Sequence, residues 1–316
     1  MPSTGEEFRT QPANPFASPA AKRPVAWQPL TPKGVAAFAL ARFNRLFWVQ
    51  GVVAALAAAS VVWFLYANWC PVIRTAMHAL PSEGSIRDGR LEYPSSGPEV
   101  LAENPYLGML VRLDEFSLTS AGADVRIEFR PRTVQVCSLL GCMVRAYSKG
   151  VVPFTAQEAV PWWQAWETPW LAIVFVVVAL ALLSIWNVLA ALACLPVRTY
   201  CYFADRSATV AGSWRLAGAA ALPGAMFLAG ALVLYGVGAI DLLRFLFAVP
   251  VHLLIFLVYL VWSPLRLPFV PEVRPPDQNP FATASAQAGA GAGDAGVATG
   301  STDGGLGAGR PAGGQR

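Results

Sequence analysis

The sequence predicts an α-helical membrane protein with four transmembrane helices plus a small β-rich extracytoplasmic domain. Of its 316 residues, 55% are hydrophobic and 13% are charged, whereas about 25% of residues are charged in typical soluble proteins. Four runs contain no charged residue, and they cover residues 46–73, 168–197, 216–240 and 245–265. Each run exceeds the roughly 20 apolar residues that cross a bilayer as a helix. The one long segment polar enough to fold in water lies between the first two runs.

Composition and local pattern divide the chain into segments. The tails are rich in Pro, Ala, Ser, Thr and Gly without hydrophobic periodicity, which predicts disorder. Thr31 and Pro32 have the chemistry of a helix start, a hydroxyl cap followed by proline. In chain order we expect a disordered cytoplasmic tail at 1–30, an amphipathic lead-in and first span at 31–67, an extracytoplasmic β-rich domain at 68–168 that ends in a Trp-rich interface segment, a second span at 169–194, a cytoplasmic loop at 195–215, a third span at 216–238, a short outer loop at 239–244, a fourth span at 245–263, and a Pro-rich then Gly/Ala-rich disordered cytoplasmic tail at 264–316.

The orientation follows from the basic residues in the short flanks of the spans. They precede the first span, lie between the second and third, and follow the fourth, as Lys33, Arg42, Arg45, Arg198, Arg206, Arg215, Arg266 and Arg274. Cytoplasmic loops carry an excess of Lys and Arg, whereas long domains translocate largely regardless of charge. We therefore expect a multi-pass protein of the cell membrane, with the lipid bilayer as its surroundings and both termini in the cytoplasm.

The polar segment between the first two spans has strand-like patterns. Asp88 and Gly89 stand between two short apolar pieces, which predicts a tight hairpin. Residues 124–130 alternate apolar and charged side chains, which predicts a strand with one buried face. Residues 133–137 and 142–147 predict a second hairpin, residues 107–114 a further strand, and residues 94–105 a loop. We expect residues 75–155 to fold by themselves as a β-rich domain and to carry any specific recognition.

Two cysteines flank the turn of the second predicted hairpin. Cys137 and Cys142 would be cross-strand neighbours, which can meet the Cβ separation of about 3.5 to 4.5 Å that a disulfide requires. An outer compartment permits the oxidation. We expect a disulfide here, against the alternative of two free or metal-bound thiols. The five cysteines form no Cys-x-x-Cys pair, so we expect no metal site, and Cys194 and Cys201 should stay reduced in the cytoplasm.

Seven aromatic side chains crowd the predicted outer boundary, where the first span ends and the second begins. They are Trp63, Tyr66, Trp69, Trp162, Trp163, Trp166 and Trp170. Amphipathic rings favour the headgroup level of a bilayer, so we interpret these residues as interface anchors. A stacking platform for sugars or other planar ligands would use the same residue types.

Three polar side chains within the spans need a reason, namely Gln50, Asn187 and His252. At 1.5 Å per residue, Gln50 and Asn187 lie roughly 6 and 10 Å from the cytoplasmic boundary, and His252 lies about 10 Å from the outer one. Gln50 and Asn187 can therefore bond each other but not His252. We interpret them as glue between helices, because an ion pathway would want ionisable groups stepped through the membrane. The third span also has a small-residue face for close packing, formed by Ala217, Ala221, Ala225 and Ala229.

A short segment after the first span resembles a known family. It contains Ala79-Leu80-Pro81, then Ile86, Asp88-Gly89, Leu91 and Pro94. This pattern resembles an uncharacterised family of bacterial four-span integral membrane proteins, known as a domain of unknown function. The resemblance implies an extracytoplasmic domain between the first and second spans and supplies no catalytic residues. Together with the preference for Arg over Lys, it suggests a bacterial inner membrane.

The sequence lacks the common catalytic and nucleotide-binding motifs, and this narrows the classes of function that we expect. The sequence has no His-Glu-x-x-His helix, no Gly-x-x-x-x-Gly-Lys loop and no Gly-x-Ser-x-Gly elbow, so we expect no enzyme and no cofactor. The basic residues are scattered, which disfavours a nucleic-acid partner. We expect a non-enzymatic binding, sensing or assembly-bracing protein that acts through its extracytoplasmic domain. The alternative is a transporter or transport accessory subunit that uses the helices.

The tails share Asn14-Pro15-Phe16 and Asn279-Pro280-Phe281, through which one cytoplasmic protein could bind both.

Overall fold

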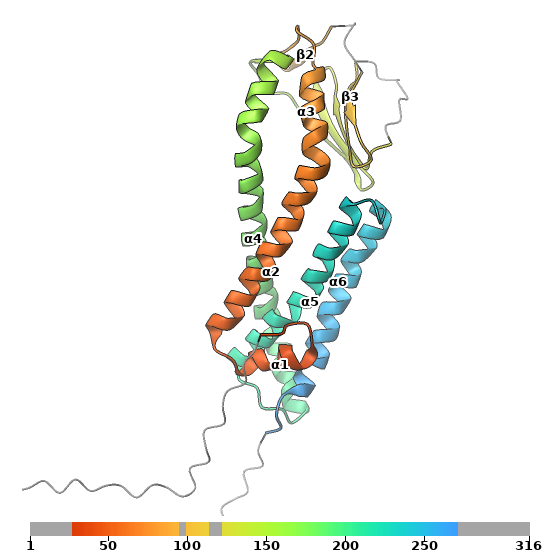
Figure 1. Ribbon diagram of the computed structural model, residues 1–316. Coiled ribbons are helices and arrows are strands. Elements are labelled where there is room, and N and C mark those ends of the chain that lie inside the picture. The colour runs from red at the N-terminus through yellow and green to blue at the C-terminus, as the bar shows by residue number, and fades with distance from the viewer. Residues whose placement is uncertain (1–26, 95–98, 114–121, 271–316) are drawn as a thin grey trace, which may run out of the picture. The chain divides into compact units, whose positions relative to one another are not determined.

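The computed structural model of the protein describes residues 27–94, 99–113 and 122–270 (Figure 1). Most of both predicted tails, with the repeated Asn-Pro-Phe sequence, lies outside the described residues. The described chain is mostly helical and includes a small region of β-sheet. Figure 1 shows the strands beside α3 and one end of α4, and α1 near the opposite end of the helices.

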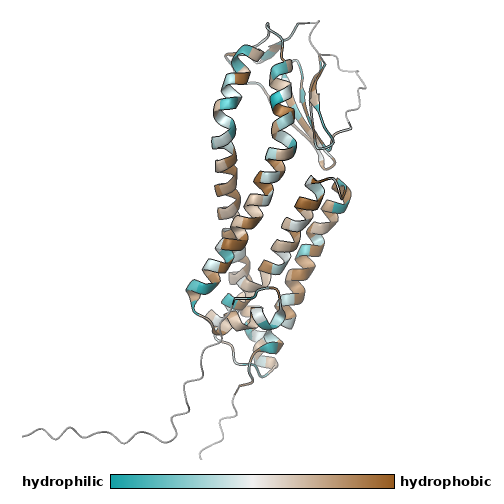
Figure 2. Cartoon of the chain, viewed as in Figure 1, coloured by the Kyte–Doolittle hydropathy of each residue, from teal (hydrophilic) through white to brown (hydrophobic). Residues whose placement is uncertain are grey.

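The described residues contain four helical segments that are long and apolar enough to cross a membrane, as the uncharged runs predict. The first combines α2 (Phe43–Phe64), the π-helical turn η1 (Leu65–Trp69) and α3 (Cys70–Ala79). The others are α4 (Ala156–Phe203), α5 (Val210–Gly236), and α6 (Leu242–Trp262) with the 3₁₀ turn η2 (Pro264–Arg266). Figure 2 shows apolar residues along much of their length.

Two of these helices are much longer than a bilayer requires. The 48 residues of α4 span about 72 Å at 1.5 Å per residue, whereas the hydrocarbon core of a bilayer is about 30 Å thick. The 68–79 and 156–168 segments, which we placed in the β-rich domain, are therefore helical continuations. Pro161 and Pro169 lie inside α4 without ending it.

The central helix of the bundle is α5. In the most apolar stretch of α5, 61% is buried, whereas the corresponding stretches of α4 and α6 are 6% and 11% buried. It packs against α1 (Pro32–Leu40), α2, α4 and α6. Ala217, Ala221 and Ala225 of the predicted small-residue face are buried, and Ala229 is half-buried. Small side chains let neighbouring backbones approach closely, which explains how one helix can contact four others.

The first helix begins as the sequence predicts but does not lead directly into the second. Thr31 Oγ1 accepts a hydrogen bond from the Gly34 amide at 3.1 Å and so caps α1. The helix ends at Leu40, and Ala41 and Arg42 are extended before α2 begins. Val35 and Phe38 are fully buried in the core around α5. The lead-in helix is thus part of the bundle core.

The strands form two sheets. The smaller has the order β2-β1-β8, with β1 at Ser85–Arg87, β2 at Arg90–Glu92 and β8 at Val151–Pro153. The larger has the order β3-β4-β5-β6-β7, with β3 at Val100–Glu103, β4 at Leu107–Val111, β5 at Val125–Phe129, β6 at Thr133–Ser138 and β7 at Gly141–Ala146. Pairing is antiparallel throughout except between β4 and β5, which are parallel. Both predicted hairpins are present, and Asp88 and Gly89 have the positive φ angles of a tight turn.

Two of our predictions for the β region, one of a loop and one of a strand, were wrong in part. Residues 94–105 were expected to be a loop, but they contain β3, whose four residues include one buried side chain, Leu101. A strand of four residues is too short to show a clear alternation of apolar and polar residues in the sequence. In β5, Ile127 and Phe129 face the core as expected, yet Glu128 on the other face is also buried. It is covered by Arg130, whose Nη2 donates to Glu128 Oε2 at 2.9 Å, and by Arg112.

A second core joins the sheets to α3. Val72 and Ala76 of α3 pack in one cluster with Ile86 and Leu91 of the small sheet and Leu107 of the large sheet. Since all of them are buried, the β region shares its core with a helix and does not form it from strands alone. We predicted that residues 75–155 fold by themselves, and part of this core lies outside those bounds.

Candidate functional site

The free edge of the large sheet is the candidate binding surface. At one end of the sheet, β3 packs against α3, and Asn104, which follows β3, donates to the backbone oxygen of Asn68 at 2.6 Å. At the other end, β7 pairs with no described strand except β6, and all six of its residues are exposed. Met143 is 72% exposed and Val144 is 58% exposed. One edge of the sheet is therefore covered and the other is open.

The predicted disulfide is present and joins the two strands at this edge. Cys137 of β6 and Cys142 of β7 are bonded, and they are directly opposed in the register, with their Cα atoms 4.0 Å apart. In an antiparallel ladder, opposed residues that share no hydrogen bonds lie about 4.5 Å apart and bonded ones about 5.5 Å. The Cys137–Cys142 pair is thus a non-hydrogen-bonded pair.

This register decides which backbone groups of β7 face outward. Non-bonded and bonded pairs alternate, so Val144 opposite Gln135 and Ala146 opposite Thr133 are also non-bonded. The next pair confirms the phase, because the Tyr147 amide donates to the Arg132 oxygen at 3.4 Å. The N–H and C=O groups of Cys142, Val144 and Ala146 therefore point away from β6, along the open edge.

The far end of the edge is fixed by Tyr147. Its hydroxyl donates to the backbone oxygen of Arg130 at 3.0 Å. Burial raises the pKa of this hydroxyl to about 12, so it remains a protonated donor at any physiological pH. The disulfide near one end of the β6–β7 hairpin and this hydrogen bond near the other hold the edge in one register.

An aromatic junction connects the β region to α5, in addition to the core that it shares with α3. Tyr106, just before β4, donates its hydroxyl to the backbone oxygens of Tyr235 and Gly236 at 2.9 and 3.2 Å. These carbonyls lie in the last turn of α5, where backbone oxygens lack their usual partners four residues on, and the Tyr235 oxygen also accepts from the Gly238 amide at 2.9 Å. In return, Tyr235 donates to a carboxylate oxygen of Asp124, at the start of β5. The Phe64 ring lies 5.5 Å from Tyr106 and 5.3 Å from Tyr235 between ring centroids, which brings α2 into the same junction.

The predicted boundary aromatics divide into two groups. Trp63, Tyr66, Trp162 and Trp166 are exposed, whereas Trp163 is buried and Trp69 and Trp170 are half-buried. Tyr66 lies 5.6 Å from the guanidinium carbon of Arg74, and the rings of Trp163 and Trp170 lie 6.1 Å apart. Sequence reasoning did not single out Arg74 or its partner Glu167, which lie 93 positions apart and form an ion pair between α3 and α4.

The structure does not bring the three intramembrane polar side chains together. Gln50 is buried and donates to the backbone oxygen of Gly218 at 3.3 Å, so it links α2 to α5. Asn187 donates to the oxygen of Leu183 in its own helix at 2.7 Å and not to Gln50. Nδ1 of His252 is buried without a hydrogen-bond partner among the described residues.

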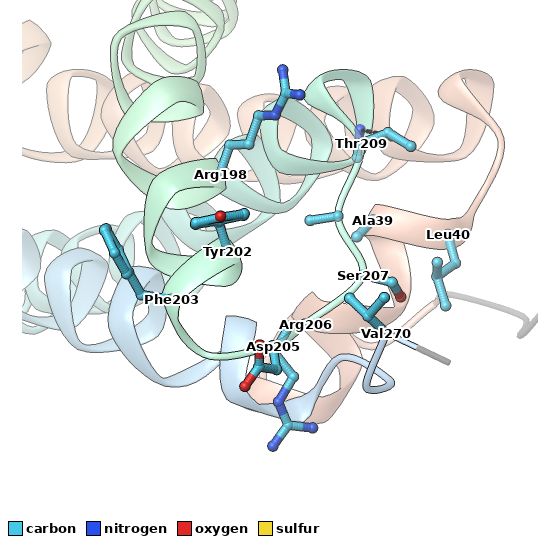
Figure 3. Close-up of a pocket in the computed structure, with 12 residues that line it drawn as sticks. Ala39, Leu40, Arg198, Tyr202, Phe203, Asp205, Arg206, Ser207, Thr209 and Val270 are labelled. Atoms are coloured by element: carbon cyan, nitrogen blue, oxygen red, sulfur yellow. Dashed lines mark hydrogen bonds between the residues drawn. The ribbon is translucent and has the colours of Figure 1, made fainter. Parts of the chain in front are cut away.

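A pocket of about 780 Å³ lies beside α1, between the end of α4 and the start of α5. Figure 3 shows its lining side chains, in which the guanidinium groups of Arg198 and Arg206 point in opposite directions. Arg206 is engaged elsewhere, because it donates to the Leu267 oxygen at 2.6 Å and lies 3.7 Å from the Phe269 ring centroid. The two charges do not converge on one ligand, and we place no site there.

The described ranges contain no group of three His, Cys, Asp or Glu side chains placed to hold a metal ion. Besides the bonded pair, the described thiols are Cys70, Cys194 and Cys201, all buried and free. No protein-family model, no curated protein and no solved structure matches this chain.

Proposed function

We propose that the protein is an integral membrane protein of the bacterial inner membrane that binds another protein through its outer β region without catalysing a reaction. In this proposal the four apolar helices cross the bilayer, both termini are cytoplasmic, and the strands lie outside. The observation that carries the proposal is the open edge of β7, with its outward N–H and C=O groups.

An open edge strand is a ready template for another strand. An extended segment that pairs with it gains main-chain hydrogen bonds, while side chains alternate above and below the sheet and give specificity. Native proteins usually block such an edge with charge, proline or a covering element. The only charged residue in β7 is Arg145, and Met143 and Val144 are apolar and exposed. The chemistry favours an extended, partly apolar protein segment as the partner.

The aromatic junction explains how binding at the sheet could serve sensing or assembly. Tyr106 directly precedes β4, and Asp124 directly precedes β5, the strand parallel to it. Both residues form a hydrogen bond with Tyr235 of α5. A partner that shifts the sheet would therefore act on the end of the central helix. We do not propose transport, because Gln50 and Asn187 are each engaged with a backbone carbonyl.

The orientation is tested with alkaline phosphatase fusions, which are active only outside the cytoplasm. We expect activity when the fusion follows residue 130, between β5 and β6, and none when it follows residue 205 or residue 300. The reason is the group of arginines around the α4–α5 connection, which are Arg198 near the end of α4, Arg206 between the helices and Arg215 near the start of α5. Short cytoplasmic loops and the adjoining span ends retain positive charge. A fusion at residue 205 that is active would overturn the proposed orientation.

The binding edge is tested with Val144→Pro in the full-length protein. The Val144 N–H does not bond to β6, so proline removes one outward donor and leaves the ladder intact. We expect partners that co-purify with the wild-type protein in mild detergent to be lost at least tenfold. The measurement is quantitative mass spectrometry of the purified complexes.

Val144→Thr is the matched control, because threonine keeps both the N–H and the β-branched shape. It should retain the partners, and the Cys137–Cys142 bond should form in both variants. Retention of the partners by Val144→Pro would show that the edge does not carry recognition. Equal loss in both variants would point to the valine side chain and not to strand addition.

A further inference from the structure

A second surface, on α2, has the composition of a lipid site. It is a groove of about 650 Å³ whose described lining is almost wholly apolar. The segment 27–30 forms one wall and α2 forms another, and α5 contributes one residue. The lining includes Trp27 and Leu30 of the segment, Trp48, Val52 and Leu56 of α2, and Met226 of α5. Any membrane helix presents apolar residues to lipid, but here the segment 27–30 converts a convex helix face into a hollow.

The segment 27–30 is held in place by specific contacts. The Tyr259 hydroxyl of α6 donates to the Leu30 oxygen, and Pro29 is buried. The segment also lies against Gly34 of α1, where a Cβ atom would lie only 1.8 Å from the backbone oxygen of Gln28. Only glycine permits this approach, so residue 34 determines whether the wall of the groove can form.

A positive charge lies at one end of the groove. The guanidinium carbon of Arg45 lies 5.0 Å from the centroid of the Trp27 ring, which itself lines the groove. Nη1 of Arg45 has no hydrogen-bond partner among the described residues, and the Arg45 side chain as a whole is half-buried, so part of it remains accessible. The sequence contains no Asp or Glu between residues 8 and 82, so no carboxylate of this long stretch competes for it. The arginine is available to an anion.

The charge and the hollow are spaced as in a phospholipid. Arg45 is the last charged residue before the uncharged run that begins at Leu46, so it lies at the headgroup level of a bilayer. From Trp48 to Leu56, the groove follows α2 for about 12 Å into the apolar stretch. Trp27 and Trp48 both line the groove, Trp27 beside Arg45 and Trp48 three positions after it, and amphipathic rings are favoured at this level of a bilayer.

We propose that this groove binds one anionic phospholipid, with its phosphate at Arg45 and an acyl chain along α2. The inference rests on membrane insertion but not on the proposed partner of β7. The anionic class follows from the unpaired arginine and the absence of nearby carboxylates in this part of the sequence, since basic clefts between spans on the cytoplasmic side recognise anionic headgroups.

The test measures lipid retention by native mass spectrometry on the full-length protein purified from nanodiscs. The nanodiscs contain equal amounts of phosphatidylglycerol and phosphatidylcholine with the same acyl chains. We expect the wild-type chain to retain one phosphatidylglycerol and at least tenfold less phosphatidylcholine. Arg45→Gln should abolish this preference, and Val52→Trp, which fills the groove, should lower retention of both lipids at least fivefold.

Two variants serve as matched controls. Val177→Trp changes a valine of α4 that is 58% exposed, compared with 57% for Val52, and that does not line the groove. Arg42→Gln removes an exposed arginine three positions from Arg45. Both should retain phosphatidylglycerol as the wild type does.

Gly34→Ala provides an independent arm, because it displaces the segment 27–30 without changing a lining residue. It should lower retention like Val52→Trp. Equal retention of both lipids by the wild type, or equal losses in the variants and their controls, would overturn the site and leave only bulk lipid. Extraction of the wild-type protein from membranes by alkaline carbonate would instead overturn membrane insertion itself.

Discussion

Gly224→Ala should lower the midpoint of thermal unfolding by about 4–8 °C, because it separates α5 from α6, the two helices with the most extensive contact among the described residues. A Cβ atom at residue 224 of α5 would lie 2.7 Å from the backbone oxygen of His252 and 3.0 Å from its ring Cδ2. A backbone carbonyl of α6 cannot rotate away as a flexible side chain can. Overpacking of this kind costs about 1–3 kcal/mol, and sometimes more. A net loss of about 2 kcal/mol corresponds to a shift of about 4–8 °C for a folded region of 150–250 residues, and the described part of the chain falls in this range.

Gly230→Ala is the control, because it makes the same substitution in the same helix. A Cβ atom at residue 230 would meet nothing within 4 Å. The change should therefore be neutral or stabilising by up to about 1 kcal/mol, since alanine favours helix more than glycine does. The measurement is the unfolding midpoint of each purified protein in one detergent. Equal shifts for the two variants would mean that α5 and α6 are not in close contact at residue 224.

The helices were predictable because hydrophobicity over some 20 residues is a strong and local signal. The C-terminal end of α3 and the N-terminal start of α4 could not be predicted in this way. The residues beyond each uncharged run are polar whether they continue a helix or enter a sheet. In the structure these two continuations contact each other. Arg74 and Glu167 are far apart in sequence, and no local pattern indicates that they meet. Helix length here is decided by tertiary packing, which also covers the apolar face of α3 with strands.

The same distinction applies to the candidate sites. The disulfide was predictable because Cys137 and Cys142 are joined by a short turn, so that local spacing fixes their distance. The partner of Gln50 was not, because it is the backbone oxygen of Gly218, which carries no side-chain signal. The open edge of β7 could not be predicted either. It depends on the order of five strands, including the parallel pair β4–β5, and that order is set by contacts distant in sequence.

Removing Arg74 should destabilise the protein more than removing Glu167, although the two form one ion pair. Arg74 Nε donates to Glu167 Oε2 at 2.8 Å, and Nη2 donates to Oε1, which makes the pair bidentate. The Glu167 side chain is 12% exposed and the Arg74 side chain is 45% exposed. Without its partner, the carboxylate of Glu167 stays largely out of water, whereas the guanidinium of Arg74 can turn into solvent. Leaving a charge buried and unpaired is the costly outcome.

We therefore expect Arg74→Gln to cost about 2–3 kcal/mol, Glu167→Gln about 1 kcal/mol, and the double variant less than their sum by roughly 1–2 kcal/mol. The free energies would come from unfolding of the four proteins under one set of conditions. Arg244→Gln is the control, because Arg244 pairs with Asp241 with both side chains more than 60% exposed, and it should change stability by less than about 0.5 kcal/mol. Additive effects of the Arg74 and Glu167 variants would mean that the pair does not join α3 to α4. In that case the helical continuation would depend on the packing of α3 against the sheets alone.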